Sequence, residues 1–324
     1  MSGFASQLGD LASAFLKHKR TLGIRYRREE GFLREFDHFA AERRESGISE
    51  PLVREYLSRR TRGSRSHHLT LVRQFAQFVQ LQQPDTFVPP PRFLGIRRSR
   101  PVIRVLSREE SARFLDACSN LPSSPGWPDR GCVLGPALRL LLLTGLRRSE
   151  LLDLEDRDVD LKTGVLTIRC GKFSKSRFVP LADEETDRLR AYRTDLLARE
   201  PGRMATDAFF PRRDGHRRCS NSSLYRAFRR VLRLAGIQHH GRGEGPRLHD
   251  LRHSFAVLRM FAWYEQGQDL RAKLPLLATY LGHVGVSTSQ VYLHMTQDLA
   301  EGVTRRHEQR FGHLITAAPE GGLS

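Results

Sequence analysis

The N-terminal part of the chain places hydrophobic residues three and four positions apart, with charged residues between them. This spacing is the period of an amphipathic α-helix that buries one face. Ser49, followed by Glu50 and Pro51, is typical of a helix start. The pattern predicts a small bundle of four short helices, with apolar stripes at Leu8, Leu11, Phe15 and Leu16; Phe32, Phe36, Phe39 and Ala40; Val53, Tyr56 and Leu57; and Leu71, Phe75, Phe78 and Val79.

The helical pattern ends at "QQPDTFVPPPRF", which continues into "LGIRRSRPVIRVLS". Three consecutive prolines forbid a helix, and the second stretch carries arginines without a helical period. We therefore predict a helical domain over residues 1–83 and an extended, positively charged linker over residues 84–106. A linker of this kind could lie along a nucleic-acid backbone.

A second domain begins at Ser107, which forms a capping box with Glu110. An apolar helix from Pro136 to Leu143 stops at Gly145. The short runs "GVLTIRC" and "RFVPL", separated by "GKFSKS", predict a β-hairpin. Further helices are predicted at 107–119, 184–199, 221–235, 247–261, 270–281 and 287–294. The fold class is therefore mainly α: an N-terminal bundle, then an α+β domain with a small antiparallel sheet over residues 107–312, and a tail over 313–324.

The chain is strongly basic. Its 324 residues include 54 Lys and Arg against 36 Asp and Glu, which gives a formal charge of +18 and a pI near 10.7. A surface this basic attracts polyanions, of which nucleic acid is the commonest large one. The surplus is spread along the chain, since residues 1–100 alone hold 19 basic and 10 acidic side chains. The charge favours a nucleic-acid partner over its alternatives, a membrane surface or a merely solubilising surface.

No stretch approaches the eighteen or so apolar residues that cross a bilayer, so we expect no membrane partner. The cysteines form no C-x-x-C pair, which argues against a zinc knuckle or a disulfide framework; they are Cys118, Cys132, Cys170 and Cys219. These features predict a cytoplasmic, nucleoid-associated protein, with a bacterial source assumed.

The stretch "PRLHDLRHSFA" places His249 and His253 four residues apart. Both could share one helix face and ligate a metal, in a near miss of the zinc-peptidase pattern. Arg252 lies three residues from His249 and shares that face too. Histidine beside arginine suits an anionic phosphate better than an open metal site, and the rest of the chain must decide between the two.

Other candidate residues each have a simple structural explanation when taken singly. Arg147 follows a helix-ending glycine and could be a surface or capping arginine, and Lys172 lies at the tip of the predicted hairpin. His249 and Arg252 could be a satisfied buried pair. Tyr292, nine residues after His283, could be a core tyrosine.

Taken together, the motifs "TGLRRSELLDL", "GKFSKSRFVPL", "HDLRHSFA" and "LGHVGVSTSQVYLH" resemble those of the tyrosine recombinase, or phage integrase, family in content, order and spacing. The resemblance covers residues 107 to about 312 closely. Over residues 1–83 it is one of architecture, and it implies a helical, SAM-like core-binding domain joined by the basic linker. It also implies a site-specific recombinase that cleaves and rejoins double-stranded DNA through a Holliday junction.

The resemblance implies a role for each matching residue. Two arginines clamp the scissile phosphate, two histidines assist them, a hairpin lysine protonates the leaving group and a tyrosine is the nucleophile: Arg147 and Arg252, His249 and His283, Lys172, and Tyr292. Phe173 stands where the family's hairpin usually has a second glycine, so Lys172 and Lys175 both remain candidates for the lysine. The long segment between Arg252 and His283 suggests a divergent, transposon-borne branch.

Elementary chemistry agrees with these roles. Two arginines can neutralise the charge that grows on an attacked phosphodiester, so no metal or other cofactor is required. A phenol with its usual pKa of about 10 must lose its proton as it attacks, and His249 is the expected acceptor. Attack by Tyr292 would leave a 3′-phosphotyrosyl bond and a free 5′-hydroxyl, which conserves the energy of the phosphodiester for rejoining.

The family works as a tetramer on synapsed DNA, so we expect a homo-oligomer there and a monomer or dimer in the free protein. We expect residues 300–324 to dock on a neighbouring protomer. Three rival functions remain: a monomeric type IB topoisomerase-like enzyme, a non-catalytic DNA-binding protein of the same fold, and a zinc peptidase built on His249 and His253. The sequence assigns neither the target DNA, nor a partner recombinase, nor the choice among integration, excision, transposition, resolution and inversion.

Overall fold

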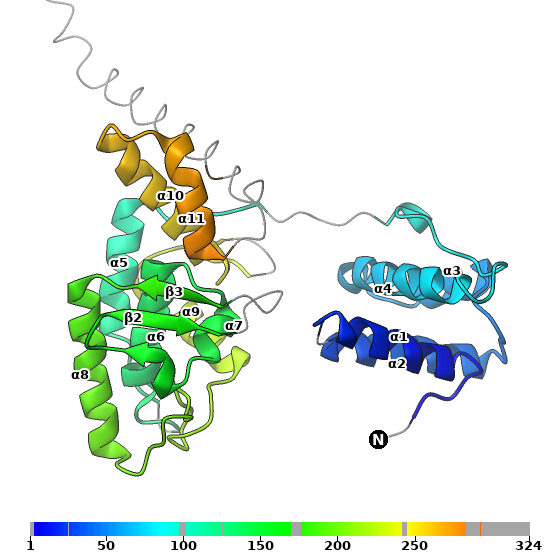
Figure 1. Cartoon of the computed structure of the whole chain (residues 1–324), viewed down its shortest axis with the longest axis horizontal. Helices are drawn as coiled ribbons and strands as arrows, with labels where there is room; N and C mark the ends of the chain where they lie inside the picture. The colour runs from blue at the N-terminus through cyan, green and yellow to red at the C-terminus, as the bar shows by residue number, and fades with distance from the viewer. Residues whose placement is uncertain are drawn as a thin grey trace, which may run out of the picture. The chain divides into compact units, whose positions relative to one another are not determined.

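The computed structural model describes residues 3–24, 26–96, 102–124, 126–169, 176–241, 245–282 and Tyr292. It divides the chain into two compact units, Met1–Pro101 and Val102–Ser324, drawn in Figure 1. Each unit has its own hydrophobic core. The fold class predicted from the sequence is confirmed, because the described residues form a helical bundle and a mainly helical unit with a small antiparallel sheet.

The first unit is the predicted bundle of short helices. It consists of α1 (Gly9–Thr21), α2 (Arg27–Glu42), α3 (Glu50–Ser58) and α4 (Arg62–Gln80). The longest helix, α4, contacts the other three, and its aromatic stripe fills the space between them. Phe15, Phe36, Tyr56 and Phe75 are fully buried there. Periodic apolar positions thus do form one continuous core, as the 3.6-residue spacing requires.

The residues that follow α4 pack on this bundle. The backbone N–H of Phe87 donates to the carbonyl of Ile48 at 3.0 Å. Phe93, in the short 3₁₀ turn η1 (Phe93–Gly95), is buried among the bundle's side chains. The structure therefore does not show an extended linker over the whole of 84–106. Residues 84–96 cover the core of the first unit, because their aromatic side chains gain burial there. Leu106 is buried in the core of the second unit.

The second unit is built around α6 (Arg130–Thr144), an apolar helix buried on most of its faces. It contacts α5 (Arg108–Ser119), α8 (Asp183–Arg199), α9 (Asn221–Leu234) and α10 (Asp250–Glu265). The short α7 (Arg148–Leu152) follows it, and α11 (Leu270–Leu281) packs against α10. The predicted helix at 287–294 lies outside the described residues, apart from Tyr292.

The antiparallel sheet has the order β1 (Val159–Asp160), β2 (Val165–Ile168), β3 (Arg177–Pro180). In β2 and β3, Leu166 pairs with Val179 and Ile168 with Arg177, which confirms the predicted hairpin. The third strand, β1, was not predicted. In Figure 1 the sheet lies across α6, while α10 and α11 form a pair beside β3.

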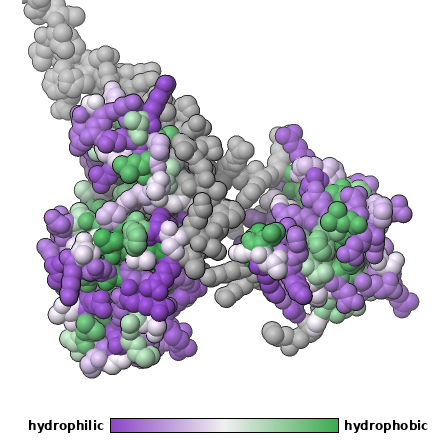
Figure 2. All heavy atoms as spheres, in the orientation of Figure 1, coloured by the Kyte–Doolittle hydropathy of each residue, from purple (hydrophilic) through white to green (hydrophobic). Residues whose placement is uncertain are grey.

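Hydrophilic side chains are interspersed with small hydrophobic patches on the visible face of each unit in Figure 2. No helix in the described part of the chain is both long enough and apolar enough to span a bilayer.

Candidate active site

Arg147 occupies the turn between α6 and α7. Gly145 ends α6 in the left-handed conformation with φ +61°, which lets the chain reverse there. Arg147 then becomes the N-cap of α7, and its backbone N–H donates to Glu150 Oε2 at 2.8 Å. Its guanidinium donates from Nη1 to Glu150 Oε1 at 2.6 Å and from Nη2 to the carbonyl of Gly282 at 2.8 Å. Arg147 is therefore held both at its backbone N–H and at its guanidinium.

Glu150 is a buried carboxylate shared by two arginines. Arg177 donates two further hydrogen bonds to it, at 2.8 and 3.0 Å. Burial raises the pKa of the Glu150 carboxyl, but hydrogen bonds from Arg177 and Arg147 outweigh burial and lower the pKa to about 2. Glu150 is thus an anion at any pH near neutrality, and it holds two guanidiniums side by side.

Arg252, on the first turn of α10, is almost fully buried. Its two terminal nitrogens donate to backbone carbonyls, Nη1 to Gly145 and Nη2 to Leu281, both at 2.7 Å. Burial, and next the charge of Arg147, lower its pKa to about 10, so it remains protonated at neutral pH. Neutral carbonyls fix the side chain without cancelling its charge, which leaves that charge available to an anion.

Tyr292 is also buried, with 2% of its surface exposed. Its hydroxyl lies 3.1 Å from His253 Nδ1. Burial raises the pKa of the phenol, against the charge and hydrogen bond of Arg252 and the charge of Arg147. The phenol and both arginines of the predicted clamp therefore belong to one site.

His253 contacts this phenol, and His249 lies against His253, with perpendicular rings whose centres are 4.9 Å apart. His249 stands at the N-cap position of α10, because the helix begins at Asp250 rather than at 247 as predicted. Burial and the charge of Arg252 lower the pKa of His249, and burial followed by the charge of His249 lowers that of His253 to about 4. Both imidazoles are neutral at pH 7 and can accept a proton.

Comparison with known proteins identifies the family. The model of the phage integrase family matches residues 104–298. The chain belongs to the phage integrase family. It is 32% identical to the integrase/recombinase y4rE of Sinorhizobium fredii over 92% of this chain and 95% of that protein. It is 33% identical to the tyrosine recombinase XerD of Oceanobacillus iheyensis over 72% of this chain and 71% of that protein.

Solved structures of the phage integrase family share this fold. The XerH site-specific recombinase bound to a palindromic difH substrate matches with a TM-score of 0.62 at 22% identity, over 91% of this chain and 83% of that chain. The Tn1549 transposon integrase in complex with transposon right-end DNA matches with a TM-score of 0.60 at 15% identity, over 91% of this chain and 98% of that chain. The family assignment makes the chain a tyrosine recombinase and does not favour a zinc peptidase.

Four of the six site residues proposed from the family motifs are described, and the structure brings them together: Arg147, His249, Arg252 and Tyr292. Lys172, Lys175 and Phe173 lie outside the described residues, as does His283. The described residues that flank them in the sequence include Arg177, the first residue of β3, and Gly282, whose carbonyl accepts from Arg147.

Sequence reasoning missed three residues of this phage integrase site. Glu150 carried a detectable signal, because a glutamate three residues after an N-cap is the second half of a capping box. The sequence pattern offers His253 only as a metal ligand, yet it is the imidazole that contacts the phenol. Arg177 carried no signal beyond its charge. Within the described part of the chain, no group of three or more His, Cys, Asp or Glu residues is arranged to hold a metal ion.

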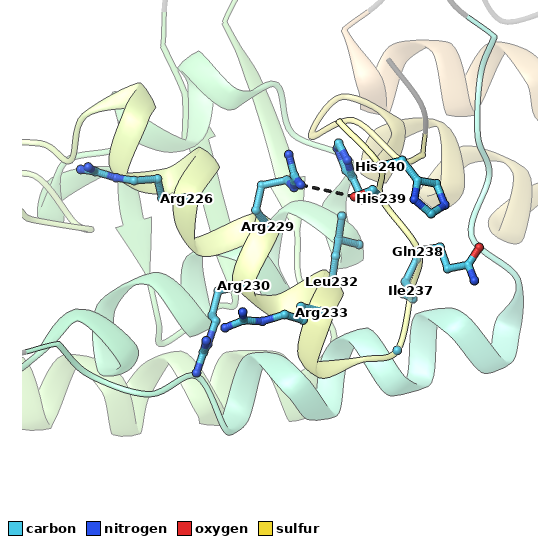
Figure 3. Close-up of a pocket in the computed structure, with 10 residues that line it drawn as sticks. Arg226, Arg229, Arg230, Leu232, Arg233, Ile237, Gln238, His239 and His240 are labelled. Atoms are coloured by element: carbon cyan, nitrogen blue, oxygen red, sulfur yellow. Dashed lines mark hydrogen bonds between the residues drawn. The ribbon is translucent and has the colours of Figure 1, made fainter. Parts of the chain in front are cut away.

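A second basic feature lies on α9. Four arginines on this helix and the loop that follows it line an open groove of about 590 Å³. In Figure 3, Arg229 reaches from α9 toward the loop at Gln238–His240 and donates to the carbonyl of His239, while Arg226, Arg230 and Arg233 project from other sides of the helix. The buried positions of α9 face the core, so these arginines occupy its outer side: Arg226, Arg229, Arg230 and Arg233.

Proposed function

We propose that this recombinase cleaves and rejoins double-stranded DNA through a covalent bond to Tyr292, and exchanges strands between two sites through a Holliday junction. The observation that carries the proposal is the burial of the Tyr292 phenol beside two fixed guanidiniums, those of Arg147 and Arg252. An ordinary core tyrosine has no need of two cations, a half-buried Arg147 fixed by Glu150 and the carbonyl of Gly282 and a buried Arg252 fixed by two carbonyls.

The arginines supply the electrostatic part of the reaction. Negative charge grows on the non-bridging oxygens of the phosphate as the phenolic oxygen approaches, and fixed cations stabilise it without reorganising. Arg147 and Arg252 are already oriented by their carbonyl partners, so little conformational entropy remains to be lost. The removal of a single such donor costs on the order of 10²–10³ in rate in a comparable site.

Proton transfer completes the cycle. The oxygen of Tyr292 bonds to phosphorus, the bond from phosphorus to the 5′-oxygen breaks, and the phenolic proton passes to a neutral imidazole. His249 is the acceptor expected from the family, and His253 is the imidazole in contact with the phenol. Lys172 or Lys175 would give a proton to the 5′-oxygen, and His283 would hold a phosphate oxygen. The reverse steps reseal the strand.

We propose that the active assembly is a tetramer on two synapsed duplexes and that residues 300–324 link its protomers. Such a protein would work at the nucleoid. Relatives named as DNA complexes, such as XerH with its difH substrate, support duplex DNA as the partner. The arginine-lined groove on α9 adds a local site for the phosphate backbone.

The decisive experiment is a denaturing gel that detects protein covalently attached to a nicked substrate. Wild-type protein and Tyr264→Phe should both give the adduct, since Tyr264 is an exposed residue of α10. Tyr292→Phe should give none. An adduct that persists in Tyr292→Phe contradicts the proposal. Recombination between two sites, scored beside relaxation of a single supercoiled plasmid, separates a recombinase from a topoisomerase-like enzyme.

A further inference from the structure

Arg177 is the first residue of β3, and its side chain is only 11% exposed. Its guanidinium uses every one of its nitrogens. Nε donates to the carbonyl of Tyr280 at 2.8 Å, while Nη1 and Nη2 donate to the two oxygens of Glu150 at 3.0 and 2.8 Å. Such a forked pair is the strongest and most directional contact that an arginine makes with a carboxylate.

These contacts tie together elements that are far apart in the sequence. Tyr280 lies near the end of α11, which packs against β3 (Figure 1). The next turn lies directly against Arg177, because a Cβ on Gly282 would lie 2.9 Å from its Nη1. The carbonyl of Gly282 is the group that accepts from Arg147. Arg177 therefore supports both anchors of Arg147, the carboxylate of Glu150 and the turn at Gly282.

Charge gives this arrangement a second consequence. Glu150 accepts hydrogen bonds from Arg147 as well as from Arg177. If Arg147 were its only partner, the Glu150 carboxylate would cancel the charge of Arg147, and the pair would attract an incoming phosphate weakly. Because Arg177 also pairs with Glu150, the three side chains together retain a net positive charge. All three nitrogens of Arg177 donate to groups of the protein, the carbonyl of Tyr280 and the carboxylate of Glu150, so Arg177 acts through these partners.

We propose that Arg177 is a positioning residue for strand cleavage, which orients Arg147 and neutralises Glu150 so that the charge of Arg147 acts on the scissile phosphate. This inference rests on the proposed function. It differs from a purely structural role because its effect on cleavage depends on the charge of the phosphate that is attacked.

The test compares Arg177→Met and wild type on two suicide substrates, one with an ordinary scissile phosphate and one with a neutral methylphosphonate there. Arg177→Met should cleave the phosphodiester about 10–100-fold more slowly, in the range expected for a displaced catalytic group. On the methylphosphonate, which lacks the charge that Arg147 neutralises, its deficit should fall to about threefold or less. Equal deficits on both substrates overturn the proposal.

Arg139→Met is the matched control. Arg139 and Glu185 form a similarly enclosed pair in the same unit, with 14% and 5% of their side chains exposed and an N–O distance of 2.8 Å. The control should lose stability yet keep the wild-type ratio of rates on the two substrates. Wild-type protein that forms no Tyr292 adduct would contradict the proposed function itself, whereas equal deficits contradict only the role of Arg177.

A second comparison removes the carboxylate charge. Glu150→Gln should speed cleavage of the phosphodiester when introduced into Arg177→Met, because Arg147 then faces a neutral amide. Arg177→Lys, which keeps the charge but loses the fork, should fall between wild type and Arg177→Met and serves if the methionine variant does not fold. A double variant no faster than Arg177→Met contradicts the neutralising part of the proposal.

Discussion

At the scale of single residues, the active site depends on a glycine that makes no contact with substrate. Gly145 has a φ of +61°, and its carbonyl accepts from Arg252. An added Cβ would lie 2.7 Å from Cδ1 of Phe255 and 3.0 Å from Cδ2 of Leu281. The position therefore requires glycine for two independent reasons, backbone conformation and space.

Gly145→Ala should lower the free energy of unfolding of the second unit by more than Gly236→Ala does. Gly236 also has a positive φ, of +66°, but has nothing within 4 Å of its added Cβ, so its variant reports the conformational cost alone, about 1 kcal/mol. We expect a further 1–3 kcal/mol at Gly145 from the crowding, roughly the cost of overpacking. Urea unfolding of both variants measures the difference, and equal losses would contradict the packing argument.

The burial of His253 makes a prediction about pH. Burial lowers its pKa to about 4, below the usual value of 6.5, so the unfolded chain takes up the proton first as the pH falls. The neutral imidazole thus contributes its full stability above about pH 6.5 and loses it progressively toward pH 4. The charges of His249, Arg247 and Arg252 also lower this pKa, and that of Asp250 opposes them.

His253→Asn should therefore lose less stability than wild type between pH 7 and pH 5. Chemical unfolding at a series of pH values gives the two slopes. If the free energy of unfolding of His253→Asn falls with pH as steeply as that of the wild type, the pKa of His253 is not lowered by folding.

The residues of the site differ in how far sequence could predict them. Arg147, His249, Arg252 and Tyr292 lie in motifs, so the sequence alone nominated them. Arg177 could not be found in this way, because its partnership with Glu150 spans 27 positions and exists only after β3 has packed beside α7 and α11. Contacts that join distant elements leave no periodic or local trace in the chain.

At the scale of elements, the sequence predicts the amphipathic helices, but it does not predict where the buried helix α6 begins or that the two-residue strand β1 exists. The start of α6 was placed at Pro136, whereas the helix begins at Arg130. Packing explains the earlier start: a Cβ on Gly131 or Gly135 would meet the carbonyl oxygen of Leu121 or Cys118 at 2.0 or 2.3 Å. Close approach to α5 stabilises the extra turns despite the internal proline. Strand β1, with two residues, is too short for any alternation to show.

The outer face of α9 makes a prediction about DNA binding. If the groove binds backbone phosphates, Arg230→Ala combined with Arg233→Ala should weaken binding to all sequences alike. Each lost phosphate contact should also reduce the slope of log affinity against log salt concentration by about 0.9. Fluorescence anisotropy at several salt concentrations measures both effects.

Arg188→Ala is the control for this experiment. Arg188 is an exposed arginine of α8 that pairs with Glu184, so its loss changes the net charge by one without touching the groove. It should leave the salt slope nearly at the wild-type value. If the double variant on α9 has that same slope, the groove makes no phosphate contact and its arginines only add to the general positive field.

At the scale of the whole molecule, the candidate active site lies in one of the two units. All four described residues of the predicted catalytic set belong to the second unit, Val102–Ser324, and the first unit has a complete core of its own. Sequence placed a boundary near the proline cluster, but aromatic residues such as Phe87 and Phe93 extend the first unit beyond it. Their burial depends on the shape of the finished bundle, which the local sequence does not reveal.

This division predicts that residues 102–324 alone can still attack DNA. The fragment should fold, because its core is self-contained, and should give the Tyr292 adduct at high DNA concentration. If the first unit also binds DNA, as the family resemblance implies, the apparent affinity of the fragment should be lower than that of the whole chain by about 10²-fold or more, since a covalent link between two binding units makes binding of the second one intramolecular. Adding residues 1–96 as a separate protein should not restore the affinity, because that link is absent. Adduct yield against DNA concentration measures the shift, and a well-folded fragment that gives no adduct at saturating DNA would show that the first unit takes part in the chemistry itself.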